Sequence, residues 1–559
     1  MATSELSLRL RCHCHGGLSS PRPCRVPPAP GVLAALYMEY LRTNKTRSAR
    51  NKLSFNEHLA SIGFTDPSAN VPGMDDRVLA QPAPGGGAQL ISIPNKVVQG
   101  TLRVKVLLVD FSDRPGTLTT GHYEDLLFSK GTHPTGSMRD YYAEVSNGKV
   151  DVIGSAHGWF RMPRKYSEYV NGESGMGQFS YPNNCQALAE DATKAAVAAG
   201  VVFPADLDAL QTDTVTALFI VHAGRGAEKE QTTDGQKAEI WSHKWNAVNP
   251  VSVGAGLSVA TYLVVNQNCR LGVCAHELGH LAFQWQDFYD PNSNKDGVFW
   301  NGSGNWDLMA SGSYNFNEAS PSHPAVLHKA QHRWVAFQEI NKSTLNVRLK
   351  PTTAPGGRAC KISSPAFSNS QYLILESRPL RGFDKHLPGE GLLVWRVDET
   401  MEMFAPATPG MTLIQADGRR ELELPNPIMQ GDDSDPFPGT EGQTDLKDTG
   451  TKASSSFPGI RSGIRLLNIS YDPVSGVSSF DVDIDVSVAG KSQSPLAVQK
   501  AIAFLGSTQL KPPLAGITTV VATASAVAAA APSAKRSAKK RVPPAPAPAP
   551  AGRGRKGKR

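Results

Sequence analysis

The sequence predicts an α+β protein, in which a twisted mixed sheet with helices is followed by a β-sandwich-like domain. Three observations support this fold class. Strand-like apolar runs alternate with helical patterns between residues 97 and 265. An apolar stretch with helical character follows at residues 271–283. After Trp334, apolar and polar residues alternate in segments separated by turn residues, which is typical of an antiparallel β domain.

The chain divides into four parts by composition. Residues 1–95 form a leading segment that ends in a Pro/Gly-rich stretch, AQPAPGGGAQ, which we interpret as a linker. Residues 96–340 carry the alternating strands and helices, and residues 341–490 are β-rich. Residues 491–559 are rich in Ala, Pro and basic residues, and we expect this tail to be disordered.

The expected elements follow the chain in order. In the leading segment, short helices are expected at residues 32–41 and 55–62. In the second part, we expect strands at 101–111, 150–160, 215–222 and 258–265, and helices at 122–128, 136–148 and 185–199. In the third part, we expect strands at 344–351, 371–379, 389–399, 462–472 and 478–486.

The net charge of +7 belongs to the tail and not to the fold. Residues 533–559 contain ten Lys or Arg and no acid, so subtracting ten from +7 leaves −3 for the rest of the chain. This tail has no aromatic residues among its Lys and Arg residues, so we expect no specific nucleic-acid partner. The uncharged stretch 514–531 is rich in Ala and Thr, and we interpret it as a linker and not as a membrane anchor.

The most informative stretch is His276-Glu277-Leu278-Gly279-His280, within LGVCAHELGHLAFQWQDFYD. On a helix, residues four apart lie on one face, so His276 and His280 can offer two imidazoles to one metal ion. Glu277 then lies beside the ion, where it can act as general base towards a zinc-activated water. The alternative is an amphipathic helix with two solvated histidines, but its flanks are apolar. The pattern predicts one catalytic zinc and peptide-bond hydrolysis.

Several segments resemble, in the same order, the immune inhibitor A family of bacterial zinc metallopeptidases, sometimes called cowrins. They are DFSDRP, GSMRDYYAEVSNGKVDV, YPNN, FIVHAGRGAE, IWSHKW, HELGH followed by DFYD, and WDLMASGSY, and the resemblance extends from Val97 to Asp485. It implies a secreted endopeptidase made as a zymogen, with a pro-region, a zincin-type catalytic domain at 96–340 and a β-rich domain. We recognise no secretory signal, because Arg9 and Arg11 interrupt the apolar run that a signal peptide requires.

The resemblance also places further site residues. Met309 in the WDLMASG segment matches the methionine turn that lies beneath the zinc in this family. Tyr314 and His323 are candidates to donate a hydrogen bond to the oxyanion, although either could be structural. Asp432, Asp433 and Asp435 gather in one turn, where a structural calcium and a solvated acidic turn are both open interpretations.

The third zinc ligand is the least determined part of the site. The position six residues past His280 is Gln286, and Phe283 stands where relatives have the glycine that turns the chain. A straight helix would carry Asp287 about 10 Å past His280, so the chain must turn between Leu281 and Asp287. Alignment with the family favours Asp290 as ligand, with Asp287 orienting a histidine. Glu318 is the next candidate.

The cysteines leave the redox compartment open. Seven are present, and Cys269 and Cys274 could either form a short disulfide loop or remain buried thiols. Cys12, Cys14 or Cys24 in the leading segment could supply a thiolate to the zinc of a zymogen.

The functional hypothesis is a monomeric zinc endopeptidase that acts on polypeptides. Two alternatives from other classes are a catalytically silent zincin-fold protein that binds through its β-rich domain, and a nucleic-acid-associated protein that works through its basic tail. The intact motif, His276, Glu277 and His280, argues against the first. Confinement of the basic charge to the tail argues against the second.

Overall fold

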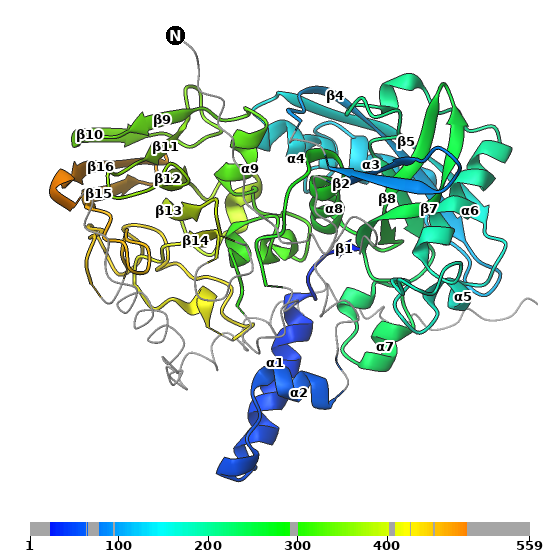
Figure 1. Ribbon diagram of the computed structural model, residues 1–559, viewed down its shortest axis with the longest axis horizontal. Coiled ribbons are helices and arrows are strands. Elements are labelled where there is room, and N and C mark those ends of the chain that lie inside the picture. The colour runs from blue at the N-terminus through cyan, green and yellow to red at the C-terminus, as the bar shows by residue number, and fades with distance from the viewer. Residues whose placement is uncertain are drawn as a thin grey trace, which may run out of the picture. The chain divides into compact units, whose positions relative to one another are not determined.

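The computed structural model describes residues 23–62, 64, 78–92, 96–290, 300–401, 409–424, 426–450 and 453–488. Residues 491–559 and the cysteines Cys12 and Cys14 lie outside these ranges, so the expectations for them stay predictions. The described chain is a mixed α/β structure in which a six-stranded sheet precedes a five-stranded and a three-stranded sheet, and a two-stranded sheet lies in the leading segment (Figure 1). Within the described ranges, no helix is both long and apolar enough to span a membrane.

The large sheet has six strands in the order β1-β7-β8-β6-β4-β5. Strands β4, β5, β6 and β8 run parallel, while β7 is antiparallel to β8 and β1 is antiparallel to β7. The bounds are β1 Cys24–Arg25, β4 Gly100–Asp110, β5 Val150–Arg161, β6 Leu218–His222, β7 His243–Gly254 and β8 Leu257–Asn266. The four strands expected in the second part are confirmed as β4, β5, β6 and β8.

Helices cover both faces of this sheet. Val106 of β4 belongs to one hydrophobic core with Leu278 of α8, whereas its neighbour Leu107 belongs to another with Leu188 of α6. Successive side chains of a strand point to opposite faces, so α8 and α6 lie on opposite sides. The helices are α3 Thr120–Phe128, α4 Met138–Val145, α5 Tyr166–Val170, α6 Cys185–Ala198, α7 Thr233–Lys237 and α8 Leu271–Phe283.

Local sequence explains where two of these helices begin. The Ser137 hydroxyl accepts from the Asp140 backbone N–H while the Asp140 carboxylate accepts from that of Ser137, which forms a capping box at the start of α4. The Asn184 side chain caps the first turn of α6 by accepting from two backbone N–H groups.

The leading segment contains two expected helices and one unexpected hairpin. The helices are confirmed as α1 Pro30–Lys45 and α2 Phe55–Ser61. The linker interpretation of AQPAPGGGAQ is wrong, because β2 Val78–Pro82 and β3 Ala88–Ser92 pair antiparallel around a glycine turn. The hairpin contacts the main sheet, where the Ala80 N–H donates to Thr261 Oγ1 at 3.4 Å.

Beyond α9 (Val326–Gln331) the chain forms two further sheets that share a hydrophobic core. One has the strand order β14-β13-β12-β11-β9 and the other β10-β16-β15. Their bounds are β9 Phe337–Ile340, β10 Thr344–Leu349, β11 Ala359–Ile362, β12 Gln371–Arg378, β13 Gly391–Asp398, β14 Met411–Leu413, β15 Ile464–Asp472 and β16 Val477–Ile484. All five expected strands of this part are therefore present.

Candidate active site

The two motif histidines lie on one face of α8 with their rings turned towards each other. Both are fully buried, and their Nε2 atoms are 3.1 Å apart. His276 Nδ1 lies 2.9 Å from the carbonyl oxygen of Leu308, and His280 Nδ1 lies 2.7 Å from that of Trp285. A carbonyl can only accept, so the geometry assigns the proton of each ring to Nδ1 and the lone pair to Nε2.

Gln284 makes the turn that the sequence requires after His280. Helix α8 ends at Phe283, and Gln284 takes a left-handed conformation (φ 56°) although it is not glycine. The Trp285 N–H then bonds back to the carbonyl of Gly279 at 3.1 Å. The chain reverses direction as predicted.

The turn brings Asp287 to the histidines. Its Oδ1 lies 3.3 Å from His276 Nε2 and 3.2 Å from His280 Nε2.

The other two candidate ligands have different surroundings. Asp290 is buried, and its backbone N–H donates to the carbonyl of Trp300 at 3.4 Å. Glu318 pairs with Lys229 at 2.6 Å. The sequence-based preference for Asp290 is thus at odds with the geometry, because the left-handed turn at Gln284 already delivers Asp287.

The donors of His276, His280 and Asp287 fit a zinc ion. On a tetrahedral zinc with bonds of about 2.0–2.1 Å, two ligand atoms lie about 3.3 Å apart. The three separations found here are 3.1, 3.2 and 3.3 Å. Two neutral imidazoles and one carboxylate are also a common donor set for catalytic zinc.

Glu277 and two tyrosines surround this group. Glu277 is fully buried on the same helix. Burial raises the pKa of both Tyr289 and Tyr314, and the Glu277 charge adds to the shift in each case. Both phenols therefore stay protonated and can donate. Tyr314 was predicted as a donor, whereas Tyr289 was missed because nothing in DFYD marks its hydroxyl.

Met309 lies against α8 between the two histidines. It is fully buried, and a Cβ added at Gly279 would be 2.9 Å from Met309 Sδ. Its carbonyl accepts from the Phe288 N–H at 2.8 Å. Met309 thus contacts both the helix and the loop that carries Asp287.

His323 belongs to a different cluster from the motif histidines. Its Nε2 lies 2.8 Å from Glu144, and its Nδ1 lies 3.0 Å from Lys329 and 3.5 Å from Asp384. These partners favour a structural role over the oxyanion role proposed from the sequence.

The acidic side chains that lie close together in the structure differ from the three predicted for a calcium site. Asp417, Glu421 and Asp432 bring one carboxylate oxygen each within 4.8 Å of one another. Burial and then the neighbouring Asp432 raise the pKa of Glu421 to about 7. Asp433 instead accepts from Thr440, and Asp435 accepts from Trp306 Nε1. Asp417 and Glu421 were missed because they lie more than ten residues earlier in the sequence.

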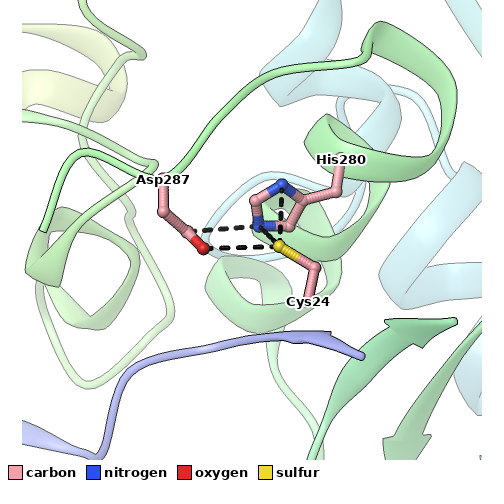
Figure 2. Close-up of side chains that lie close together, drawn as sticks. All are labelled: Cys24, His280 and Asp287. Atoms are coloured by element: carbon pink, nitrogen blue, oxygen red, sulfur yellow. Dashed lines mark hydrogen bonds and ion pairs between the residues drawn. The ribbon is translucent and has the colours of Figure 1, made fainter. Parts of the chain in front are cut away.

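A thiol from the leading segment reaches the site. Figure 2 shows Cys24 Sγ facing both the His280 ring and the Asp287 carboxylate. The distances are 3.7 Å to His280 Nε2 and 3.4 Å to Asp287 Oδ2. Of the three cysteines suggested from the sequence, this one is present beside the histidines. Cys269 and Cys274 are buried free thiols, as one of the two interpretations had it.

Comparison with known proteins finds peptidases that are similar to the middle part of the chain. Residues 98–338 match the family described as immune inhibitor A peptidase M6, catalytic domain. The chain is 26% identical over 303 residues to pre-pro-metalloprotease PrtV of Vibrio cholerae, covering 45% of this chain and 32% of PrtV. It is 26% identical over 283 residues to immune inhibitor A of Bacillus thuringiensis, covering 41% of this chain and 39% of that protein.

The chain thus spans less than two fifths of the length of these curated relatives. The matched residues contain β4 to β8, the histidine helix α8 and the methionine turn, which are the elements that build the site. The resemblance seen in the sequence is confirmed: residues 98–338 are similar to the catalytic domain of the immune inhibitor A family of metallopeptidases, peptidase family M6.

Proposed function

We propose that this protein is a zinc-dependent endopeptidase that hydrolyses peptide bonds in polypeptides. The observation that carries the proposal is the convergence of His276 Nε2, His280 Nε2 and Asp287 Oδ1 beside the buried Glu277. The relatives named as metalloprotease and peptidase support it. When bound, zinc lowers the pKa of a water molecule and polarises the scissile carbonyl.

The chain's own residues perform the proton transfers in this proposal. Glu277 takes a proton from the attacking water and later passes it to the leaving amine. The hydroxyls of Tyr289 and Tyr314 are the donors available to the carbonyl oxygen as it gains negative charge. His276 and His280 keep their orientation because backbone carbonyls hold their Nδ1 protons.

The substrate is expected to bind as an extended strand. In the described sheet, β7 pairs with β8 on one side and with the two-residue β1 on the other. A polypeptide in the place of β1 would hydrogen-bond along β7 and pass the histidines of α8. Backbone pairing of this kind accepts many side chains, which suits a protease with protein substrates.

The domain assignment and the metal content extend this proposal. Residues 96–340 would form a zincin-type catalytic domain, and the two later sheets a β-sandwich. A structural calcium would bind Asp417, Glu421 and Asp432, where it would relieve the repulsion that raises the pKa of Glu421. The name pre-pro-metalloprotease of the Vibrio relative supports an exported precursor with a pro-segment.

The decisive test compares the protein with Glu277→Gln. We expect loss of casein hydrolysis by about 10²–10⁴-fold, because the general base is lost while the zinc ligands remain. Zinc content, measured by plasma mass spectrometry, should be unchanged, and a chelator should abolish wild-type activity. Activity near wild type in Glu277→Gln, or loss of zinc from it, would show that Glu277 has another role.

A further inference from the structure

We propose that Cys24 binds the catalytic metal as a thiolate and that the segment Cys24–Ala29 lies in the substrate's place, which keeps the full-length protein latent. This inference rests on the proposed function, since it needs the metal held by His276, His280 and Asp287. It assigns a fourth protein ligand to the position that the attacking water requires.

The thiol belongs to a group that can hold a metal ion, together with His280 and Asp287. Cys24 Sγ is 3.7 Å from His280 Nε2, 3.8 Å from His280 Nδ1 and 3.4 Å from Asp287 Oδ2. The two nearly equal distances place the sulfur over the face of the His280 ring, so the thiol must turn towards the Nε2 lone pair to form a Zn–S bond of about 2.3 Å. The side chain is only 6% exposed, so it is enclosed in the site and not merely near it. Thiolate sulfur is among the strongest protein ligands for zinc.

The backbone around Cys24 binds as a substrate strand would. Strand β1 pairs antiparallel with β7, with Cys24 opposite Lys244 and Arg25 opposite His243. The Val26 N–H donates to the carbonyl of Ser242 at 3.3 Å. These bonds use the edge of β7 that an incoming polypeptide would need.

Two hydroxyls of the site are already engaged by this segment. Tyr289 donates to the carbonyl of Arg25 at 2.6 Å, and Tyr314 donates to that of Pro27 at 2.5 Å. These are the donors that we assign to the carbonyl of a substrate. The segment therefore competes for the β7 edge, for both hydroxyls and for the metal at the same time.

Further contacts hold the segment on either side of the thiol. The Arg25 guanidinium lies over the Trp241 ring at 4.8 Å, and Trp241 Nε1 donates to the carbonyl of Val26 at 2.9 Å. The Ala29 N–H donates to the carbonyl of Glu228 at 2.9 Å, directly before α1. Such contacts raise the effective concentration of Cys24 at the metal, which lets one thiol block the site.

Activation requires no covalent chemistry at the sulfur. A water molecule replaces the sulfur, and the thiolate takes up one proton from solvent as it leaves. Displacement or cleavage of the leading segment would drive this exchange, because either removes the β7 pairing that holds Cys24 in place.

The first test is the spectrum of the full-length protein loaded with Co²⁺. A thiolate ligand gives an intense sulfur-to-cobalt charge-transfer band in the near ultraviolet, which nitrogen and oxygen ligands lack. We expect this band in the wild type and in Cys360→Ser, and its loss in Cys24→Ser. Cys360 is the matched control, since it is a buried free thiol in strand β11. A bound Co²⁺ without the band in the wild type, or a band retained in Cys24→Ser, would overturn the proposal.

The second test measures latency in the same zinc-loaded proteins. We assume that at most about 10% of the wild-type molecules have Cys24 detached from the metal. Cys24→Ser should then hydrolyse casein about tenfold faster or more than the wild type. Cys360→Ser should hydrolyse it at the wild-type rate. Equal rates for wild type and Cys24→Ser would overturn latency. Activity in Cys24→Ser that Glu277→Gln then abolishes would still uphold the proposed function, so the two failures can be told apart.

A third measurement needs no variant and does not depend on activity. In the folded wild type, alkylation of Cys24 should be slower with metal bound than after chelation, as mapped by peptide mass spectrometry, because chelation frees the thiol and removes one of the contacts that hold the segment. The buried Cys185 serves as the internal reference and should stay unreactive in both states while the protein is folded. Equal alkylation rates of Cys24 with and without metal would overturn the assignment.

Discussion

At the residue scale, two backbone carbonyls decide what the motif histidines can do. The carbonyls of Leu308 and Trp285 hold the Nδ1 protons, so both Nε2 lone pairs face the same point. The pair His276 and His280 could be predicted because their spacing alone places them on one helix face. Asp287 could not be chosen over Asp290, because that choice depends on one left-handed residue, Gln284, that the sequence does not mark.

A prediction on metal content follows for the two aspartates. We expect Asp287→Ala to lose most of its zinc, because its carboxylate touches both Nε2 atoms. Asp290→Ala should keep its zinc, since its carboxylate is not among the donors assigned to the ion. Plasma mass spectrometry after gel filtration measures both, with circular dichroism as the folding control. Zinc loss in Asp290→Ala with retention in Asp287→Ala would restore the sequence-based assignment.

The sequence could also not single out Cys24 as the cysteine that lies beside the motif histidines. Its thiol was one of three in the leading segment that the sequence offered as ligands. Selection among them requires the pairing of β1 with β7, which joins residues more than 200 positions apart. Long-range pairing of a two-residue strand leaves no periodic pattern in the sequence.

At the element scale, the buried parallel strands were the easiest to predict. Strand β4 has an almost continuous buried run, because helices cover both faces of the sheet. The hairpin of β2 and β3 was missed because its turn is rich in Pro and Gly, which are also typical of linkers. Gly85 and Gly86 both take φ 99°, so here glycine serves a tight turn and not flexibility.

The left-handed residue that follows helix α8 leads to a prediction on stability and zinc binding. Gln284 has φ 56°, where a β-branched side chain is strongly disfavoured. We expect Gln284→Ile to lower the free energy of unfolding by about 2 kcal/mol and to weaken zinc binding, because the turn places Asp287. Gln284→Gly should keep full zinc occupancy, since glycine accepts this conformation.

Urea unfolding and zinc titration of both variants test this prediction. Gln284→Gly is the control for the side chain itself, because it also loses the bond from the Lys96 N–H to Gln284 Oε1. Equal zinc affinity in the isoleucine and glycine variants would mean that the backbone conformation at Gln284 does not control the third ligand.

At the scale of the whole molecule, contacts join the catalytic elements to the later sheets. Glu144 of α4 accepts from the Phe383 N–H at 2.9 Å and pairs with His323. The Tyr141 ring packs against that of Phe383 at 5.1 Å between centroids. The sequence indicated a boundary near residue 340 from the change in pattern. It could not show these contacts, because their partners come from separate stretches of the chain.

Buried neutral histidines link the stability of the whole fold to pH. His332 Nδ1 accepts from the Val98 N–H at 3.2 Å and its Nε2 donates to the carbonyl of Phe283 at 2.9 Å, so only the neutral ring satisfies both. Burial lowers the pKa of His332 and of His243 to about 4 and that of His222 to about 3. The ordinary histidine pKa is about 6.5.

Between these values the unfolded chain binds more protons than the folded one. The contribution of these three histidines to the free energy of unfolding is therefore highest above pH 6.5 and falls as the pH drops towards 4, whereas Glu421 and Asp307, whose pKa values are raised to about 7 and about 6, contribute in the opposite direction. We expect a loss of about 2 kcal/mol per histidine between pH 7.5 and pH 5. Urea unfolding at the two pH values, in the presence of a chelator to remove the pH dependence of metal binding, measures this loss. Imidazole ring signals of these three histidines that titrate between pH 7.5 and pH 5 in the folded protein, followed by nuclear magnetic resonance, would show that the rings are not held in the neutral form.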